Sequence, residues 1–329
     1  MRHSPLRYSL RRSLAAFIAV ATTLAVADAS LAQERKLRLG VMRIAAMATP
    51  YVAKEQGFFK KHGLDVELVP IRSGAEGIQA MQGGNVDATL AIPSFAMAAN
   101  ERRFDLVMVY QNELAHDSPP DSGGMLVRKD SPIQSLKDLA GRTVAVNALH
   151  AQEAVSAQFL LRKAGLSKDQ VKYVEAPHPT LGDLLMRGQA DAVVTIDPFT
   201  TMIRERGGRV IAWQYAEAVP SQPIGTFWSK RAWADRNVEL IEAFTTAMDE
   251  AITWVNADPV RTQGVVAEFT KLPADIVKAM PMIVWSSKID LARWTEMIAM
   301  LKTMGEIQDD HKPQEYFHSV VMRRLGQKG

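Results

Sequence analysis

The sequence predicts an α/β fold made of two lobes with largely parallel sheets. Short apolar stretches of strand length alternate with stretches of helical pattern over most of the 329 residues, and this alternation is typical of βαβ units. A polar stretch at 113–124 that contains Pro and Gly interrupts the alternation, and a second series follows it. The length is sufficient for two domains.

The first series is expected to contain four strands and three helices. Its first helix should end at Gly63, because glycine adopts the left-handed conformation that closes many helices. The expected strands are 37–42, 64–71, 87–92 and 104–110, and the expected helices are 49–61, 75–82 and a third from 93 onward.

The second series should contain five strands, at 125–128, 143–147, 171–175, 192–196 and 210–213. Its expected helices are 136–140, 151–164, 180–187 and 199–205. From 231 onward the pattern is mostly helical, with an amphipathic run at 238–255 and no further strand series. We therefore expect this tail to pack back on the first lobe.

An internal echo links the two series. Residues 84–88 (GNVDA) and 188–192 (GQADA) each lead into a strand that ends at a proline, Pro93 or Pro198. Glycine ends a helix in both copies and proline starts the next. The echo indicates either two related lobes or punctuation that is common in α/β chains. It also places two helix N-termini at the carboxyl ends of strands, where open α/β sheets bind ligands.

Residues 1–32 are predicted to be a cleaved signal peptide, because four arginines precede or flank an apolar run at 14–27 and small residues follow it. The alternative, a membrane anchor, needs a longer run of about 20 residues. Cleavage after Ala29 and cleavage after Ala32 both remain open. The Arg11-Arg12 pair leaves twin-arginine export open beside the ordinary secretory route.

Composition narrows the function classes. The segment 1–32 holds four of the 39 Lys and Arg and one of the 36 Asp and Glu, so the remainder carries 35 of each. A neutral chain without a basic run argues against nucleic-acid binding. The chain has no cysteine, so it has no disulfide and no residue to carry a lipid at the cleavage site. We expect a free periplasmic protein.

Motifs for catalysis or cofactor binding are not found. The seven histidines are scattered without metal-ligand spacing, and no phosphate loop, dinucleotide fingerprint or nucleophile elbow occurs. We therefore expect no catalytic residues, no metal and no cofactor.

Several segments in order resemble a known family. Residues 51–66, 84–88, 137–146 and 197–199 resemble the nitrate/taurine/sulfonate group of periplasmic binding proteins, also called SsuA/THI5-like or NMT1-like. The resemblance implies a type II periplasmic-binding-protein fold, with the ligand between two lobes joined by two crossovers near 113–124 and 214–223. On this template the first lobe is 35–112 plus 225–329, and the second lobe is 113–224.

The resemblance also implies a function: a solute-binding subunit that delivers a small molecule to the membrane permease and separate ATPase of an ABC importer. Two alternatives stay open. Enzymes of the same fold make the thiamine pyrimidine or act in menaquinone synthesis, although the pyrimidine-forming relatives carry a cysteine-rich motif that this chain lacks. A ligand sensor without transport is the other.

Candidate ligand-binding residues in the first lobe follow its strands. Arg43 either clamps a carboxylate or sulfonate, or faces solvent at the end of its strand. Ser94 either binds an anion at its helix N-terminus or simply starts the helix. The other lining candidates are Ala46 and Met47 in the first loop, Phe95 beside Ser94, and Gln111 at the first crossover.

In the second lobe, relatives have Gly and Ser or Thr after the strand that corresponds to 145–147, where backbone N–H groups hold an oxyanion. This chain has bulkier residues there, which puts nitrate and simple sulfonates in doubt. Asn147, His150 and Gln152 are lining candidates, and Phe199, Trp213 and Trp228 are candidate walls.

Asp197 stands before Pro198 at the end of a strand and the start of a helix. The residue either caps the helix or accepts a hydrogen bond from a ligand donor. Together with Arg43 and His150, the ligand-facing alternative predicts a ligand with both an anionic group and a donor or aromatic body. Such a ligand is anionic or zwitterionic overall.

Overall fold

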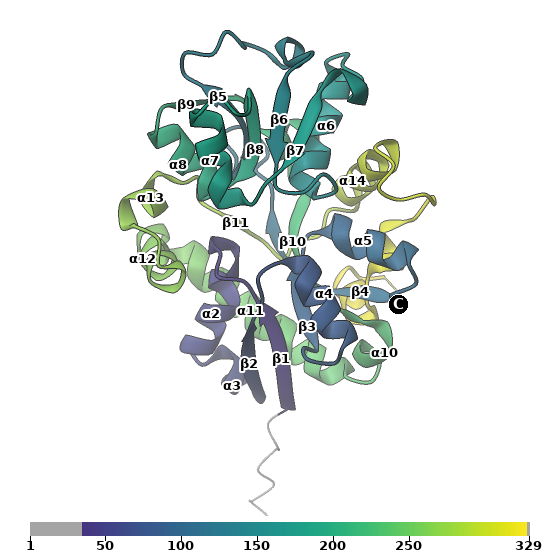
Figure 1. Ribbon diagram of the computed structural model, residues 1–329. Helices are drawn as coiled ribbons and strands as arrows, with labels where there is room; N and C mark the ends of the chain where they lie inside the picture. Colours follow the sequence, from purple (N-terminus) through teal and green to yellow (C-terminus); the bar gives the residue numbers. More distant parts are fainter. Residues whose placement is uncertain (1–34, 328–329) are drawn as a thin grey trace, which may run out of the picture.

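The computed structural model describes residues 35–327, and the predicted signal peptide at 1–32 lies outside them. The described chain forms two α/β lobes, one around a six-stranded sheet and the other around a five-stranded sheet (Figure 1). The predicted α/β class with two lobes is therefore confirmed.

The six-stranded sheet has the order β11-β4-β10-β3-β1-β2. Its β1–β2 and β1–β3 pairs are parallel, whereas β10 runs antiparallel between β3 and β4. The strands are β1 (Arg35–Val41), β2 (Leu64–Pro70), β3 (Ala88–Ala91), β4 (Leu106–Leu114), β10 (Pro223–Lys230) and β11 (Val284–Trp285).

The five-stranded sheet has the order β7-β6-β8-β5-β9, with parallel pairing of β6 to β7 and β8 and antiparallel pairing of β5 to β8 and β9. Its strands are β5 (Gly123–Arg128), β6 (Thr143–Val146), β7 (Lys172–Glu175), β8 (Ala192–Ile196) and β9 (Gly208–Ala212).

The two sheets repeat one arrangement, β2-β1-β3 in the first and β7-β6-β8 in the second. In the first copy Asp87 Oδ2 accepts the N–H of Arg38 at 2.8 Å, and in the second Asp191 Oδ2 accepts the N–H of Thr143 at 2.8 Å. The aspartates of the sequence echo thus join a strand to its parallel neighbour in both lobes. The echo therefore marks equivalent positions in two lobes that share one strand arrangement.

The helices flank the sheets. Those within the two βα series are α2 (Ala48–Glu55), α3 (Phe58–Lys61), α4 (Gly74–Gln82), α5 (Pro93–Glu101), α6 (Gln152–Lys163), α7 (His178–Met186), α8 (Phe199–Glu205) and α9 (Gln214–Ala218). The tail contributes α10 (Arg231–Ala234), α11 (Val238–Ala257), α12 (Pro259–Thr270), α13 (Ala274–Ala279), α14 (Leu291–Thr303) and α15 (Ser319–Arg324). Short 3₁₀ turns are η1 (Ala45–Met47), η2 (Leu136–Leu139), η3 (Lys168–Gln170) and η4 (Pro313–Tyr316).

The tail packs on both lobes rather than on the first alone. Helix α11 packs against α2 and α3 of the first lobe. Helix α14 instead lies beside α6 of the second lobe (Figure 1), where Arg162 donates to the carbonyl of Thr303 at 3.1 Å. Apolar side chains of α14 join one continuous core that contains residues of both lobes. This packing gives the two lobes a shared flank.

One helix and two strands depart from the sequence expectations. The helix expected at 49–61 is two helices, because Gly57 between them adopts a left-handed φ of 73°. Strands β10 and β11 were not expected, and β10 lies in the middle of the six-stranded sheet. Strand β10 precedes the tail, which begins at Arg231 and is mostly helical as expected, with the two-residue edge strand β11 as its departure from that expectation.

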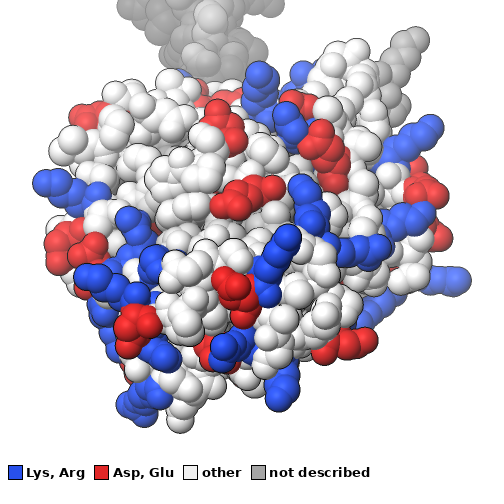
Figure 2. Space-filling view, turned by 90° about the horizontal axis from the view of Figure 1, so that it is seen from above, with Lys and Arg blue, Asp and Glu red and all other residues white. Residues whose placement is uncertain are grey.

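Lys and Arg alternate with Asp and Glu on the outer face of the second lobe (Figure 2). Neither sign of charge dominates that face, which fits the neutral balance of the chain after its first 32 residues. Among the helices in the described residues, none combines the length and apolar character needed to cross a bilayer.

Candidate functional site

Gln152 ties the two lobes together where α5 and α6 begin. Its side chain is fully buried. The Nε2 group donates to Gln222 Oε1 and to the carbonyl of Pro223, both at 2.9 Å, and Oε1 accepts the N–H of Ser94 at 3.4 Å. Gln152 and Ser94, two of the predicted ligand-binding residues, are therefore in direct contact.

Further polar side chains extend this contact into the second lobe. Gln222 donates to the carbonyl of Tyr215 at 3.0 Å, and Tyr215 donates its hydroxyl to Glu153 Oε2 at 3.5 Å. The other oxygen of Glu153 lies 3.5 Å from His178 Nε2. We call Gln152, Glu153, His178, Tyr215 and Gln222 the junction network.

Burial changes the pKa of the tyrosine in this network. Tyr215 is 3% exposed. Burial, followed by the charge of Glu153, raises the pKa of Tyr215 well above its usual value, so the phenol stays protonated as a donor.

His178 is held from three sides. Its Nδ1 lies 2.9 Å from the Thr195 hydroxyl, and its ring stacks on Phe199 with centroids 5.6 Å apart and planes within 5°. The predicted wall residue Phe199 therefore borders the junction network. Glu153 and His178 themselves were not predicted, although each stands in the first turn of the helix that follows a parallel strand. The same positional signal that selected Gln152 could have found both.

Asp197 caps its helix with one carboxylate oxygen only. Its Oδ1 accepts the N–H of Thr201 in the first turn of α8 at 2.9 Å, while Oδ2 is buried without a hydrogen-bond partner among the described residues. Burial raises the pKa of Asp197 to about 6, against the lowering effect of the neighbouring Thr201. Asp197 thus accepts an N–H of the first turn of α8 from one residue before the N-cap, Pro198, and its second acceptor atom stays free.

Two more carboxyl groups lie beside the first crossover. Asp121 is fully buried and well satisfied, because it accepts from His116 Nδ1 at 3.0 Å and from the N–H groups of Ser122 at 2.7 Å and Ala216 at 2.8 Å. Glu113 at the end of β4 is 8% exposed. Burial, followed by the charge of Asp121, raises the pKa of Glu113 to about 8.

Four buried polar atoms near this region lack a hydrogen-bond partner in the described part of the chain: Ser94 Oγ, Asp197 Oδ2, Thr201 Oγ1 and Gln214 Oε1. They lie at the starts of α5, α8 and α9. Buried polar atoms are nearly always paired in native proteins, and desolvating one without a partner is costly. The starts of these three helices therefore hold polar atoms whose hydrogen bonds are not supplied by the described part of the chain.

The first loop, residues 43–47, was predicted to line the ligand site, and the structure places its side chains elsewhere. Met47 is fully buried in the core of the first lobe, and the carbonyl of Ala46 accepts from Asn112 at 3.0 Å and from the Trp285 indole at 3.3 Å. These two residues support the core instead of lining a site. Arg43 is exposed, and its side chain forms no hydrogen bond or ion pair with the residues that the structure describes.

Three other residues that were predicted to bind the ligand lie away from the junction network. Trp228 is fully buried, donates to Thr226 at 2.7 Å and packs edge-on to Tyr316, so it is a core residue rather than a wall. Gln111 accepts from the Trp294 indole at 2.9 Å and lines a separate pocket in the first lobe. Phe95 is half-buried against the core.

The remaining predicted residues lie at the edge of the second lobe. His150 is exposed and pairs with Glu306 at 3.1 Å, so it joins the lobes at the surface. Trp213 is half-buried beneath the guanidinium of Arg204, which lies 5.8 Å from the ring centroid. Asn147 is half-buried directly after β6.

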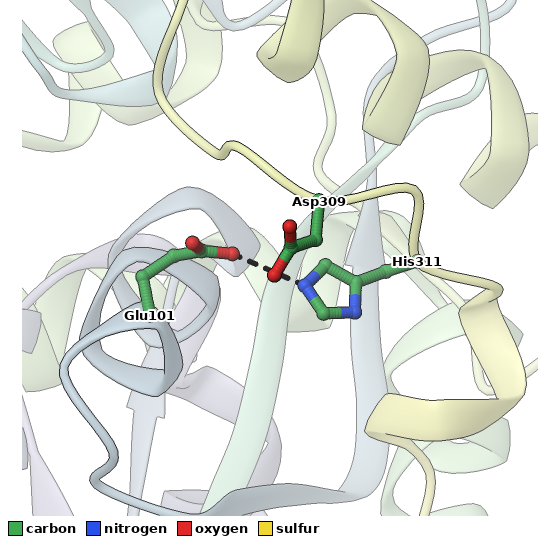
Figure 3. Close-up of side chains that lie close together, drawn as sticks. All are labelled: Glu101, Asp309 and His311. Carbon is green, nitrogen blue, oxygen red and sulfur yellow. Dashed lines mark hydrogen bonds and ion pairs between the residues drawn. The ribbon is translucent and has the colours of Figure 1, made fainter.

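A cluster of titratable side chains lies apart from the junction, where Glu101, Asp309 and His311 converge (Figure 3). His311 Nε2 lies 3.1 Å from Glu101, and its Nδ1 lies 3.0 Å from Glu315. Burial lowers the pKa of His311, but hydrogen bonds to Glu315 and Glu101 outweigh burial and raise it. A protonated histidine between two carboxylates accounts for this geometry without a metal ion.

Two α/β lobes that repeat the strand arrangement β2-β1-β3 and β7-β6-β8 define the periplasmic-binding-protein fold. The chain belongs to the NMT1/THI5 like family, whose model matches residues 45–262.

The similar proteins include binding proteins and an enzyme. The formylaminopyrimidine-binding protein of Halalkalibacterium halodurans is 25% identical over 64% of this chain and 62% of its own length. The periplasmic aliphatic sulphonate binding protein SsuA of Escherichia coli superposes with a TM-score of 0.72 at 17% identity, over 86% of this chain and 97% of that one. The desulfurization enzyme DSZB superposes with a TM-score of 0.65 at 16% identity, over 89% and 99%. The structural likenesses establish the fold.

Proposed function

We propose that this protein is the solute-binding subunit of an ABC importer. It binds one small molecule where its lobes meet and delivers it to a membrane permease that a separate ATPase drives. The protein has no catalytic role in this proposal. The observation that carries the proposal is the group of unpartnered buried atoms, Ser94 Oγ, Asp197 Oδ2, Thr201 Oγ1 and Gln214 Oε1, at the helix starts beside the junction network.

The proposal includes the location and the division of the chain. Cleavage of residues 1–32 would release the protein into the periplasm, where the substrates of importers are captured. The first lobe would be 35–112 plus 225–329 and the second lobe 113–224. The crossovers between them then contain Asp121 and Gln222, which anchor the junction network from the hinge side.

Binding is expected to move the lobes as rigid bodies about these crossovers. The buried contact between Gln152 and Ser94 would form on closure, because the Gln152 side chain and the Ser94 backbone N–H come from opposite lobes. The surface pair of His150 and Glu306 would form with it.

A thermal-shift screen of the mature chain tests the proposal, with a panel that contains cationic, anionic, zwitterionic and neutral solutes. A ligand at 100 times its Kd should stabilise the protein by about 2.7 kcal/mol. Small-angle scattering with a confirmed ligand should then give a smaller radius of gyration. If no solute of any class stabilises the protein, or if the radius is unchanged at saturation, the proposal is wrong.

A further inference from the structure

A cavity of about 440 Å³ lies on the flank where the tail packs against the second lobe. Its walls are the second half of α6, the loop from α6 into η3, strand β7 and the end of α14. Sites for small molecules typically have volumes of about 300–1,000 Å³. None of the residues that line this cavity belongs to the junction network, so it is a separate candidate site.

One side of the cavity is apolar and well fixed. Leu161 and Leu166 line it, and both are buried members of the core that joins the two lobes. Met304 at the end of α14 also lines it and packs against the same core. A hydrocarbon group in contact with these side chains would be removed from water, at a gain of about 25 cal/mol for each Å² buried.

The charged residues of the cavity are all basic. Arg162 and Lys168 line it, and no Asp or Glu is among its lining residues. Neither cation forms an ion pair with a residue that the structure describes. Arg162 donates one guanidinium N–H to the carbonyl of Thr303, another lining residue, at 3.1 Å. This bond fixes the guanidinium beside the cavity and leaves its other N–H groups for a ligand.

Tyr173 of β7 adds a third donor. The residue lines the cavity and is half-buried, and its hydroxyl forms no hydrogen bond within residues 35–327. Burial raises the pKa of Tyr173 to about 12, so the phenol is protonated at neutral pH. The cavity therefore combines three side-chain donors with an apolar side, and its charge favours an anionic acceptor.

We propose that this cavity binds a small amphipathic carboxylate. Its carboxylate group accepts hydrogen bonds from Arg162, Lys168 and Tyr173, and its hydrocarbon part packs on the apolar side. Both cations are exposed, so the charged group stays close to water while the hydrocarbon part leaves it. A bound molecule also holds the end of α14 against the second lobe, because Thr303 and Met304 line the same cavity. The proposal does not rest on the proposed function.

Matched probes test the ligand class by titration calorimetry. Phenylbutyrate and octanoate are each compared with the amide and the amine of the same carbon frame. The carboxylates should bind with Kd values at least about tenfold lower than those of the amides, because a charge-assisted hydrogen bond is stronger than a neutral one. The amines should not bind beside two cations.

Three variants locate the carboxylate. Arg162→Gln, Lys168→Gln and Tyr173→Phe should each raise the Kd of phenylbutyrate by about fivefold or more. Lys168 makes no side-chain hydrogen bond or ion pair with the described residues, so its replacement leaves the fold intact. Lys163→Gln is the matched control, because Lys163 is the next residue of α6 and lies over the Phe159 ring rather than in the cavity. Its Kd should equal that of the parent chain.

Three results would overturn the proposal. If neither carboxylate binds, the cavity is not a site for this class. If the amides or amines bind as tightly as the carboxylates, the charge of the ligand is wrong. If the carboxylates bind but all three variants keep the parent Kd, the molecule is bound elsewhere, for example where the lobes meet. None of these results decides whether the protein also captures a solute at the junction network.

Discussion

Replacing Asp197 by Asn should stabilise the empty protein at neutral pH. The carboxyl group has a pKa of about 6 in the folded chain, because burial disfavours its charged form, against an ordinary value of 3.8. The folded state therefore binds the proton more tightly than the unfolded state. Stability from this group is complete below about pH 4, falls as the pH rises towards 6, and stays lost above that.

The magnitude follows from the difference in pKa. One pKa unit corresponds to about 1.4 kcal/mol, so the charged carboxylate destabilises the native state by about 3 kcal/mol at pH 7. Asn retains an acceptor for the Thr201 N–H but leaves a buried amide N–H₂ that costs about 1 kcal/mol. The expected net gain is about 2 kcal/mol at pH 7, and it should disappear near pH 4.5.

Urea unfolding of the parent, Asp197→Asn and Asp258→Asn at pH 7 and pH 4.5 measures these quantities. The Asp258→Asn control removes the charge of an exposed cap whose Oδ1 accepts the Arg261 N–H at 3.0 Å, and it should lower the stability by less than about 1 kcal/mol at both values. If Asp197→Asn is destabilising at pH 7, or if its effect is the same at both pH values, the buried carboxylate is not strained and the reasoning is refuted.

Three further predictions concern packing and charge elsewhere. Gly225→Ala should destabilise the fold by about 1–3 kcal/mol, because an added Cβ would lie 2.7 Å from the Glu113 side chain. The control Gly264→Ala changes an open helical position and should be neutral or stabilising. Equal melting temperatures for the two variants would contradict this prediction. Trp228→Phe should lower the free energy of unfolding by about 2 kcal/mol, because packing and a buried hydrogen bond are lost, but it should leave the Kd for a solute unchanged. A changed Kd in calorimetry would show that this residue belongs to the binding site. His311→Gln should lower the free energy of unfolding by up to about 1 kcal/mol at pH 5.5 and leave it unchanged at pH 8.5. The reason is that the raised pKa of this histidine gives stability that is lost as the pH rises through that pKa. Unfolding curves with the same difference at both pH values would disprove the charged state.

The sequence alone was sufficient for features that depend on local pattern. Alternating strands and helices predicted the α/β class, because hydrophobic periodicity is written residue by residue. The paired segments at 84–88 and 188–192 left open whether the two lobes are related, and Asp87 and Asp191 now make equivalent hydrogen bonds to backbone N–H groups in the two lobes. The position of Asp197 before Pro198 offered helix capping as one of two alternatives, and its hydrogen bond with the Thr201 N–H agrees with that alternative.

Part of the candidate site could also be predicted from the sequence. Gln152, Asp197 and Phe199 follow strands whose carboxyl ends meet at one edge of a sheet, and this position together with the family resemblance selected them. The same rule would have selected Glu153 and His178. Position does not give the direction of a side chain, which is why Trp228 and Met47 were placed in the site although both belong to the core.

Only the tertiary structure decided how distant segments meet. Strand β10 takes a central place in the six-stranded sheet because its hydrogen-bond partners are β3 and β4, and no local pattern encodes a partner so far along the chain. Helix α14 packs on α6 for the same reason, since its apolar face fits surfaces that exist only after both lobes have formed. The tertiary structure also decides whether a carboxylate is paired, because its burial and its hydrogen-bond partners are properties of the folded chain rather than of the residue.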